Sequence, residues 1–250
     1  EDAVTAQAGV GGTVEGMVPL LPFQAEFFET GMPRRNHWNQ ALLLHSREPL
    51  DLPALESALV AVMEHHDAFR LRFGQDADGA WRQACEPLPE NWHQGLLWVS
   101  QSKDAAGVEA LCDEAHRSLD LEQGPLLRPL AIKLADGSWR LLLAIHHLVI
   151  DGVSWRILLE DLGHAYARLR AGEPVMLPAK TGSVKDWALA LQAHAAAYGD
   201  EELAFWRPLT RASAELPCEH PEGANTQAER VSVELRLDRA RTHALLKKVP

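Results

Sequence analysis

The chain has 250 residues, 46% of them hydrophobic, which is enough for one large domain or two small ones with a buried core. Its 24 basic and 35 acidic residues give a formal net charge of −11, and the acidic residues are spread along the chain. This balance argues against nucleic acid or an anionic membrane as the main partner, and we interpret it as a solubilising surface.

The cysteines are widely spaced and form no C-x-x-C pair, so the sequence indicates neither a disulfide framework nor a zinc site. We therefore expect a reducing, cytoplasmic environment. The longest apolar run is bracketed by Arg140 and two histidines, and it is shorter than the roughly 18 to 20 residues of a membrane helix. The sequence begins at Glu1 without a basic-then-apolar leader, and we interpret it as part of a longer protein.

The N-terminal half is predicted to alternate short helices and strands. Residues 1–17 are interpreted as a linker and the start of the domain, because their glycines lack the preceding strand and the Lys-Ser/Thr ending of a phosphate-binding loop. The elements expected after them are helix 22–32, strand 37–45, helix 52–65, strands 71–73, 80–86 and 96–100, and helix 103–119.

A pair of adjacent histidines, His65 and His66, ends the helix that Asp51 begins as a capping carboxylate. Histidine side chains interact favourably with the negative end of a helix dipole, and this accounts for the pair without a catalytic role. We therefore interpret His65 and His66 as a helix terminus.

A second histidine pair lies in the stretch Trp139–Gly152, WRLLLAIHHLVIDG, where an apolar run ends. Asp136-Gly137 separates this run from the apolar run 126–135, and such a dipeptide supplies the two positive-φ positions of a tight hairpin. Because side chains alternate along a strand, His146 and His147 cannot both face one cleft unless the strand has ended. We expect one of them to act and the other to support it.

The C-terminal part of the chain is predicted to be mainly helical. Apolar spacing predicts a helix over 153–171 that ends at Gly172. The later elements are expected to be helices 184–198 and 202–206, an irregular segment 207–226, an alternating strand 228–237, and helix 239–248 capped by Asp238. The irregular mixture of strands and helices indicates an α+β layer sandwich and not a doubly wound sheet.

His147, at the predicted end of a strand, has the side chain best suited to take and give a proton near neutral pH. We expect Asp151 to pin the following turn by accepting hydrogen bonds; the alternative is that it orients the histidine. A metal site of His146, His147 and Asp151 is disfavoured, because neighbouring strand histidines point apart. The sequence has no Gly-x-Ser-x-Gly elbow, which argues against a serine-hydrolase triad.

The string HHLVIDGVSW, residues 146–155, resembles the HHxxxDG signature of the condensation superfamily of nonribosomal peptide synthetases, which also covers chloramphenicol acetyltransferase-like acyltransferases. The likeness extends over about residues 17–250, through VPLLPFQAEFF, NHWNQALLL, EHHDAFRLRF and LPAKTGSVKDWALAL. It implies an α+β, chloramphenicol acetyltransferase-like two-layer sandwich. Residues 18–225 would form the N-terminal lobe of a V-shaped two-lobe domain, and residues 226–250 would begin the C-terminal lobe.

The resemblance also implies roles for the signature residues. His147, the second histidine, is expected to be catalytic, whereas Gly152 is expected to allow the turn. The residues expected to support the site are His146, Asp151, Gly152, Ser154 and Trp155. No cofactor of the domain's own and no metal is implied.

Within the superfamily, the chain is more similar to epimerization domains than to condensation domains. The strings that carry this likeness are Phe27-Phe28 after Gln24, Asn36–Gln40, Ser154-Trp155, and the segment from Lys180-Thr181 to Trp187. Such a domain removes the α-proton of an aminoacyl or peptidyl thioester and returns it from the other face. The implied partners are a peptidyl carrier protein, whose phosphopantetheine arm holds the substrate, the neighbouring synthetase domains and the C-terminal lobe.

The family's second acid/base is a glutamate in an EGHGRE-like motif of the C-terminal lobe, and no such motif occurs in these 250 residues. We therefore assign no glutamate and expect this chain to hold one half of the active site. The main alternative is a condensation domain that forms a peptide bond. A non-catalytic carrier-docking fragment has no need of the intact HHLVIDG, and the linker-like start disfavours a free-standing acyltransferase that uses coenzyme A.

Overall fold

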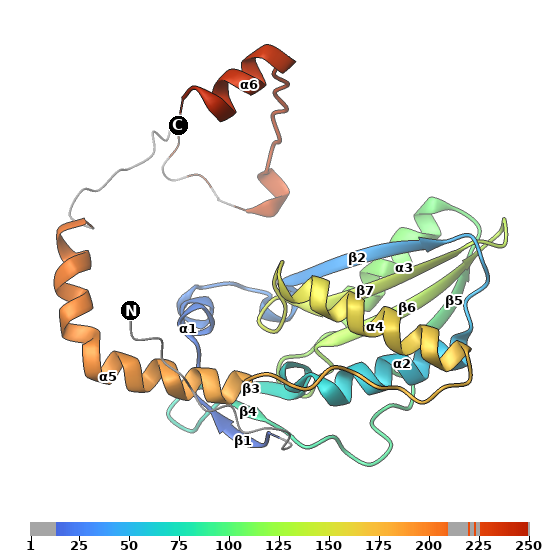
Figure 1. Cartoon of the computed structure of the whole chain (residues 1–250), viewed down its shortest axis with the longest axis horizontal. Helices are drawn as coiled ribbons and strands as arrows, with labels where there is room; N and C mark the ends of the chain where they lie inside the picture. Colours follow the sequence, from blue (N-terminus) through green and yellow to red (C-terminus); the bar gives the residue numbers. More distant parts are fainter. Residues whose placement is uncertain (1–13, 210–219, 221–222, 224–225, 250) are drawn as a thin grey trace. The chain divides into compact units, whose positions relative to one another are not determined.

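A computed structural model describes residues 14–209, 220, 223 and 226–249. The chain divides into two compact units, residues 1–199 and 200–250, and each is described here by itself (Figure 1). Most of the predicted linker 1–17 and of the predicted irregular segment 207–226 lies outside the described residues.

The centre of the first unit is a four-stranded sheet in the order β2-β7-β6-β5. Its strands are β2 (Asn39–Ser46), β5 (Trp98–Ser102), β6 (Leu127–Leu134) and β7 (Trp139–His146). β5 and β6 run parallel, and the other neighbours run antiparallel, with Asn39 opposite His146 in the β2–β7 pair. The hairpin predicted on either side of Asp136-Gly137 is therefore confirmed as β6–β7.

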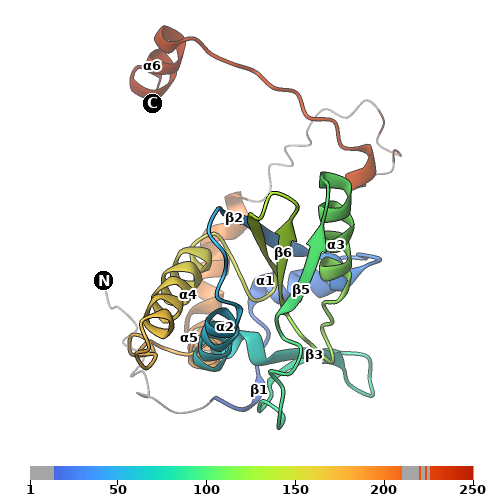
Figure 2. The ribbon, with the colours of Figure 1, turned by 90° about the vertical axis from the view of Figure 1, so that its right-hand side faces the viewer.

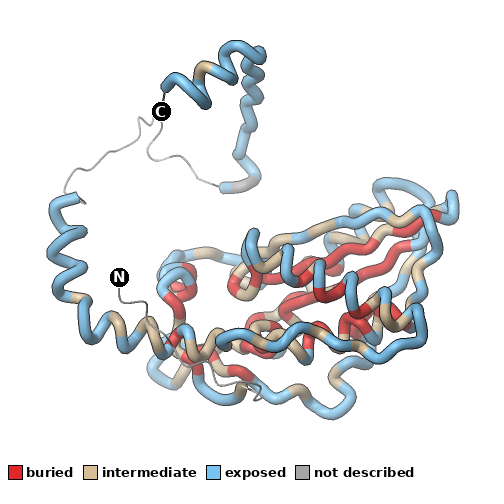
Figure 3. Tube along the Cα trace, viewed as in Figure 1, coloured by how far each residue is buried: buried red, intermediate tan, exposed pale blue. Residues whose placement is uncertain are grey.

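Helices cover both faces of this sheet, as Figure 2 shows. The helices α2 (Leu52–His65) and α4 (Ser154–Arg170) pack on one face, against a core that includes Leu141, Leu143 and Ile145. The helix α3 (Ala105–Arg117) packs on the other face, against Leu142 and Ala144. Because both faces are buried, β7 reads as a continuous apolar run and not as an alternating one (Figure 3).

A smaller antiparallel sheet in the order β1-β4-β3 lies beside the main one and packs against α1 (Pro22–Glu29). Its strands are β1 (Gly16–Val18), β3 (Leu71–Gln75) and β4 (Trp81–Cys85), so the predicted pair around Gly74–Gly79 is confirmed. Short 3-10 turns, Arg35–His37 and Asp67–Arg70, lead into β2 and β3. The predicted strand 37–45 thus begins two residues late, at Asn39.

The turn of the β6–β7 hairpin differs from the prediction in one respect. Gly137 has a φ of +83°, but Asp136 is not among the described residues with positive φ. Asp136 instead accepts hydrogen bonds from the Ser138 backbone N–H at 2.9 Å and from the Ser138 hydroxyl at 2.6 Å. The side chain of Asp136 therefore closes the turn, and only the glycine takes the left-handed conformation.

Two C-terminal predictions are wrong. The helices expected at 184–198 and 202–206 form one helix, α5 (Val184–Leu209), because a glycine in a helix interior such as Gly199 costs only about 0.5 to 1 kcal/mol, which need not break the helix. The expected strand 228–237 has no strand partner among the described residues; a 3-10 turn, Gln227–Glu229, begins it, and Val233 is 81% exposed. Alternating apolar residues cannot form a strand without a neighbour to accept their hydrogen bonds.

The final helix, α6 (Arg239–Lys247), is capped as predicted, since Asp238 accepts a hydrogen bond from the Arg241 backbone N–H at 2.8 Å. Among the described helices, none combines the length and the apolar character needed to span a bilayer.

Candidate functional site

The signature begins where β7 ends. His146 is the last residue of the strand and is fully buried, whereas His147 lies in the turn that follows and is half-buried. Because the strand ends between them, the two side chains can point in different directions and have different roles, as expected from the alternation of side chains along a strand.

Both ring nitrogens of His146 are occupied by backbone groups. Its Nε2 donates to the Arg35 carbonyl at 2.7 Å, and its Nδ1 accepts from the Leu148 N–H at 3.2 Å. Burial lowers the pKa of His146 to about 4, so the ring is neutral at pH 7. This arrangement ties the 3-10 turn Arg35–His37 to the end of β7 and leaves His146 no lone pair for catalysis or for a metal.

His147 is held in the opposite tautomer. Its Nδ1 lies 2.8 Å from the Ile150 carbonyl, which can only accept, so Nδ1 carries a proton, and in the neutral ring Nε2 then carries the lone pair. The His147 backbone N–H donates to the Trp38 carbonyl at 2.8 Å, and the Trp38 ring lies 4.4 Å from the imidazole between centroids. The backbone of its own turn thus presents Nε2 of His147 as a proton acceptor.

Gln40, on β2, faces that lone pair. The Gln40 Nε2 lies 3.1 Å from His147 Nε2, and the Gln40 Oε1 accepts from the Trp155 indole N–H at 2.7 Å. Gln40 was not predicted as a site residue, although it lies in the NHWNQALLL string. No local signal identifies it, because the contact depends on the pairing of β2 with β7.

Asp151 pins the turn into α4, as predicted. Its Oδ1 accepts from the backbone N–H groups of Val153 at 3.0 Å and Ser154 at 2.7 Å, and from the Ser154 hydroxyl at 2.7 Å. These hydrogen bonds from Ser154 lower the pKa of Asp151 and keep the carboxylate ionised. Asp151 and Ser154 therefore begin α4 and fix the direction in which Trp155 leaves the turn.

Gly152 does not adopt the left-handed backbone conformation that favours glycine. Its φ lies outside the left-handed region, and a Cβ added there would meet no atom within 4 Å. The expectation that Gly152 allows the turn is therefore not supported by the backbone of this chain.

The histidine pair His65-His66 ends α2, as predicted. In addition, His66 Nε2 lies 2.8 Å from Asp161 Oδ2 on α4. The two residues are 95 positions apart, and no sequence pattern predicts their contact.

Comparisons with known proteins identify the family of this chain. The model of the condensation domain family matches residues 14–249. A linear gramicidin synthase of Brevibacillus parabrevis is 40% identical over 243 residues, which cover 96% of this chain and 5% of that protein. Tyrocidine synthase 2 of the same organism is 38% identical over 245 residues, covering 95% of this chain and 7% of that protein.

Solved structures show the same fold. The epimerization domain from the third module of tyrocidine synthetase B superposes with a TM-score of 0.75 at 37% identity, covering 82% of this chain and 47% of that one. The first condensation domain of the calcium-dependent antibiotic synthetase, at 24% identity, gives a TM-score of 0.64 over 77% of this chain and 48% of that one, and shows the fold alone. The predicted chloramphenicol acetyltransferase-like sandwich is confirmed, and the chain spans about half of such a domain. The chain belongs to the condensation domain family.

Proposed function

We propose that this chain is the N-terminal lobe of an epimerization domain of a nonribosomal peptide synthetase. In this proposal the domain converts the α-carbon of an aminoacyl or peptidyl thioester from L to D while a carrier-protein phosphopantetheine arm holds the substrate. Residues 226–250 begin the C-terminal lobe, and the protein works in the cytosol. The similarity to the epimerization domain of tyrocidine synthetase B, at 37% identity, supports this choice.

The observation that carries the proposal is the tautomer of His147. A base that removes an α-proton needs an unprotonated nitrogen directed at the substrate, and the bond from Nδ1 to the Ile150 carbonyl leaves Nε2 in that form. Gln40 lies at 3.1 Å from this nitrogen, so the substrate must displace the amide when it reaches His147. Imidazole that has taken the proton can return it, which gives His147 the role of one acid/base.

Inversion requires a second group on the opposite face of the α-carbon, and the enolate-like oxygen of the thioester requires hydrogen-bond donors. This chain contains no EGHGRE-like motif, so we assign the second acid/base to the C-terminal lobe. Other partners in this proposal are the peptidyl carrier protein and the neighbouring synthetase domains. The domain supplies no cofactor of its own, because the phosphopantetheine arrives with the substrate.

The runner-up is a condensation domain, in which His147 would assist the attack of an amine on an upstream thioester. The two activities are separated by offering a carrier-loaded L-aminoacyl thioester in deuterated water to the longest polypeptide that carries this chain. Deuterium at the α-carbon together with D-residue on the carrier supports epimerization. Dipeptide formation from two loaded carriers without exchange would show condensation instead.

A third possibility is a non-catalytic carrier-docking fragment. It predicts neither exchange nor peptide formation from that polypeptide, and either product would exclude it.

The proposal also requires both lobes for activity, and this can be tested separately. The 250-residue chain alone is expected to give little or no D-residue. Robust turnover by the chain alone would refute the assignment of the second acid/base to another lobe.

A further inference from the structure

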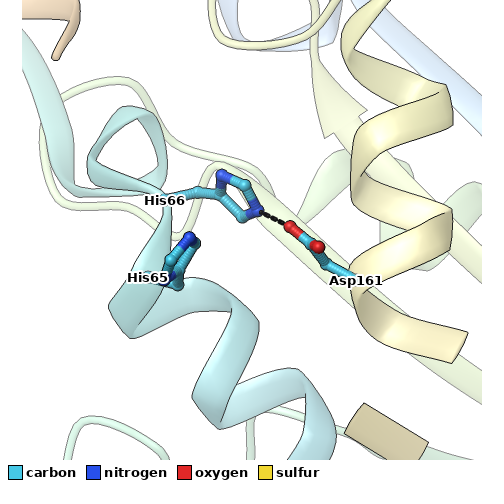
Figure 4. A group of neighbouring side chains, drawn as sticks. All are labelled: His65, His66 and Asp161. Atoms are coloured by element: carbon cyan, nitrogen blue, oxygen red, sulfur yellow. Dashed lines mark hydrogen bonds and ion pairs between the residues drawn. The ribbon is translucent and has the colours of Figure 1, made fainter. Parts of the chain in front are cut away.

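The strongest cluster of metal-ligating side chains outside the signature lies where α2 ends beside α4. His65 and His66 come from the end of α2, and Asp161 comes from the middle of α4 (Figure 4). One ligand atom from each of the three residues lies within 4.8 Å of the others. We propose that His65, His66 and Asp161 bind a divalent transition-metal ion, with Zn²⁺ the best match.

Adjacent histidines usually diverge, and these converge because the helix stops between them. His65 is the last helical residue, whereas His66 has φ −93° and ψ 103°, an extended conformation that turns its ring beside that of His65. The two ring centroids lie 4.9 Å apart at an interplanar angle of 85°. Both rings therefore reach the same volume, in contrast to the strand-end pair His146 and His147.

The three ligand atoms lie within 4.8 Å of one another, so small movements are needed to form a tetrahedral site. With metal–ligand bonds of about 2.0 to 2.1 Å, ligand atoms in such a site lie about 3.4 Å apart. The His66–Asp161 contact of 2.8 Å has to open slightly, and the His65 ring has to approach. Both histidines are half-buried, whereas Asp161 is buried, so the movement is expected mainly from the histidine side chains.

Two features favour a cation at this point, the end of α2 and the buried carboxylate of Asp161. The C-terminal end of α2 carries the negative end of a helix dipole. Lys180, which lines the same cavity as the three proposed ligands, and Arg70 both bond to the single carboxylate of Asp67, at 3.0 and 2.6 Å, so Asp67 balances only one of these two positive charges and the other opposes a bound cation. Two imidazole nitrogens and one carboxylate oxygen are a donor set that suits Zn²⁺ and related ions better than Mg²⁺ or Ca²⁺.

Three protein ligands leave a fourth coordination position for water or another small ligand. The three residues line a cavity of about 310 Å³, together with the segment Pro178–Val184. His66 also lines a second cavity with Val149, Ile150 and Ser154 of the signature turn. A metal here would fasten the end of α2 to α4 next to the turn that holds His147.

Zinc binding is to be measured on the 250-residue chain after removal of metal, by titration with ZnCl₂ against a chromophoric chelator. We expect one equivalent to bind, and His65→Ala and Asp161→Asn each to weaken binding by at least about tenfold. The amide of Asp161→Asn can still bond to His66, which preserves the fold. His164→Ala, an exposed histidine on the same helix, is the matched control and should bind as the unaltered chain does.

Two further readouts exclude other zinc ligands. Zn²⁺ should raise the thermal midpoint of the unaltered chain and of His164→Ala, but not that of His65→Ala or Asp161→Asn. Co²⁺ should give tetrahedral absorption without a thiolate charge-transfer band. Equal zinc affinity in the unaltered chain and both ligand variants, or a thiolate band that assigns the ion to cysteine, would overturn the proposal.

Discussion

Trp155 donates its indole N–H to Gln40 Oε1 at 2.7 Å, and this bond decides which end of the Gln40 amide faces His147. An indole N–H can only donate, so the carbonyl end of the amide must turn to Trp155 and the NH₂ end to His147 Nε2 at 3.1 Å. The amide then meets the lone pair of a neutral ring, whereas a protonated ring would place two N–H donors opposite each other. In the proposed function, Trp155 and Gln40 are thus positioning residues for His147.

Trp155→Phe removes the indole donor and frees the Gln40 amide to turn. The loss of one hydrogen bond is worth about 1 kcal/mol, so we expect α-proton exchange by the domain to fall about fivefold. Gln40→Ala removes the same positioning contact, and because the Gln40 amide has to leave His147 Nε2 before the α-proton arrives, its effect should be no larger than that of Trp155→Phe. The double variant should be no worse than the poorer single variant, because the two residues act through one contact. Fully additive losses would show that Trp155 acts independently of Gln40.

His146→Asn should change how stability depends on pH. The unfolded chain binds a proton at this histidine near pH 6.5, whereas burial lowers the folded pKa to about 4. Stability is therefore lost as the pH falls from 6.5 toward 4, by up to about 3 kcal/mol from this residue.

The test of this pH dependence is urea unfolding at about pH 7.5 and about pH 4.5, on either side of most of this titration, followed by tryptophan fluorescence. His146→Asn keeps a donor for the Arg35 carbonyl but has no ring to titrate, so its stability should fall less between these pH values. The same substitution at exposed His45 controls for the loss of one histidine. An equal fall in His146→Asn and in the unaltered chain would contradict the prediction.

Asp151→Ala removes the acceptor of three hydrogen bonds at the start of α4. Asp151 lies two residues before the N-cap Val153, but it accepts from the first backbone N–H groups of the helix as a capping side chain does. The loss of such an acceptor costs about 1 kcal/mol, so we expect the free energy of unfolding to fall by roughly that amount. Asp151→Asn retains an acceptor oxygen and should lose less. If Asp151→Ala left stability unchanged while abolishing activity, the carboxylate would have a direct catalytic role in place of the pinning role.

Gly152→Ala tests whether the turn needs a glycine. The φ of Gly152 is outside the left-handed region and a Cβ has free space, so the chain should fold with unchanged stability or gain about 0.4 to 1 kcal/mol. The free energy of unfolding in urea measures this directly. A loss above about 1 kcal/mol would mean that the turn is strained in a way that the backbone geometry does not reveal.

Much of the fold follows from local signals in the sequence. Asp51 and Asp238 cap helices where the capping pattern predicts them, and Gly137 turns the β6–β7 hairpin. The prediction fails at residues 228–237, where a clear strand pattern has no strand partner in the described part of the chain. A strand is a property of two segments, so periodicity in one of them cannot establish it.

The site residues likewise include some that local sequence signals predict and others that depend on distant contacts. The division between buried His146 and turn residue His147 follows from strand alternation and from the signature itself. Gln40 and Asp161 could not be predicted, because they lie 107 and 95 residues from the histidines that they contact. Such contacts depend on the pairing of β2 with β7 and on the packing of α2 against α4.

In the proposed function His147 is an acid/base for the α-carbon, and the rate of α-proton exchange measures that role. The longest polypeptide that carries this chain is incubated with a carrier-bound L-aminoacyl thioester in deuterated water, and the deuterium in the released amino acid is measured by mass spectrometry. We predict that His147→Ala lowers exchange by about 10² to 10⁴-fold, whereas His164→Ala leaves it unchanged. Exchange at the unaltered rate in a folded His147→Ala protein would contradict the assignment.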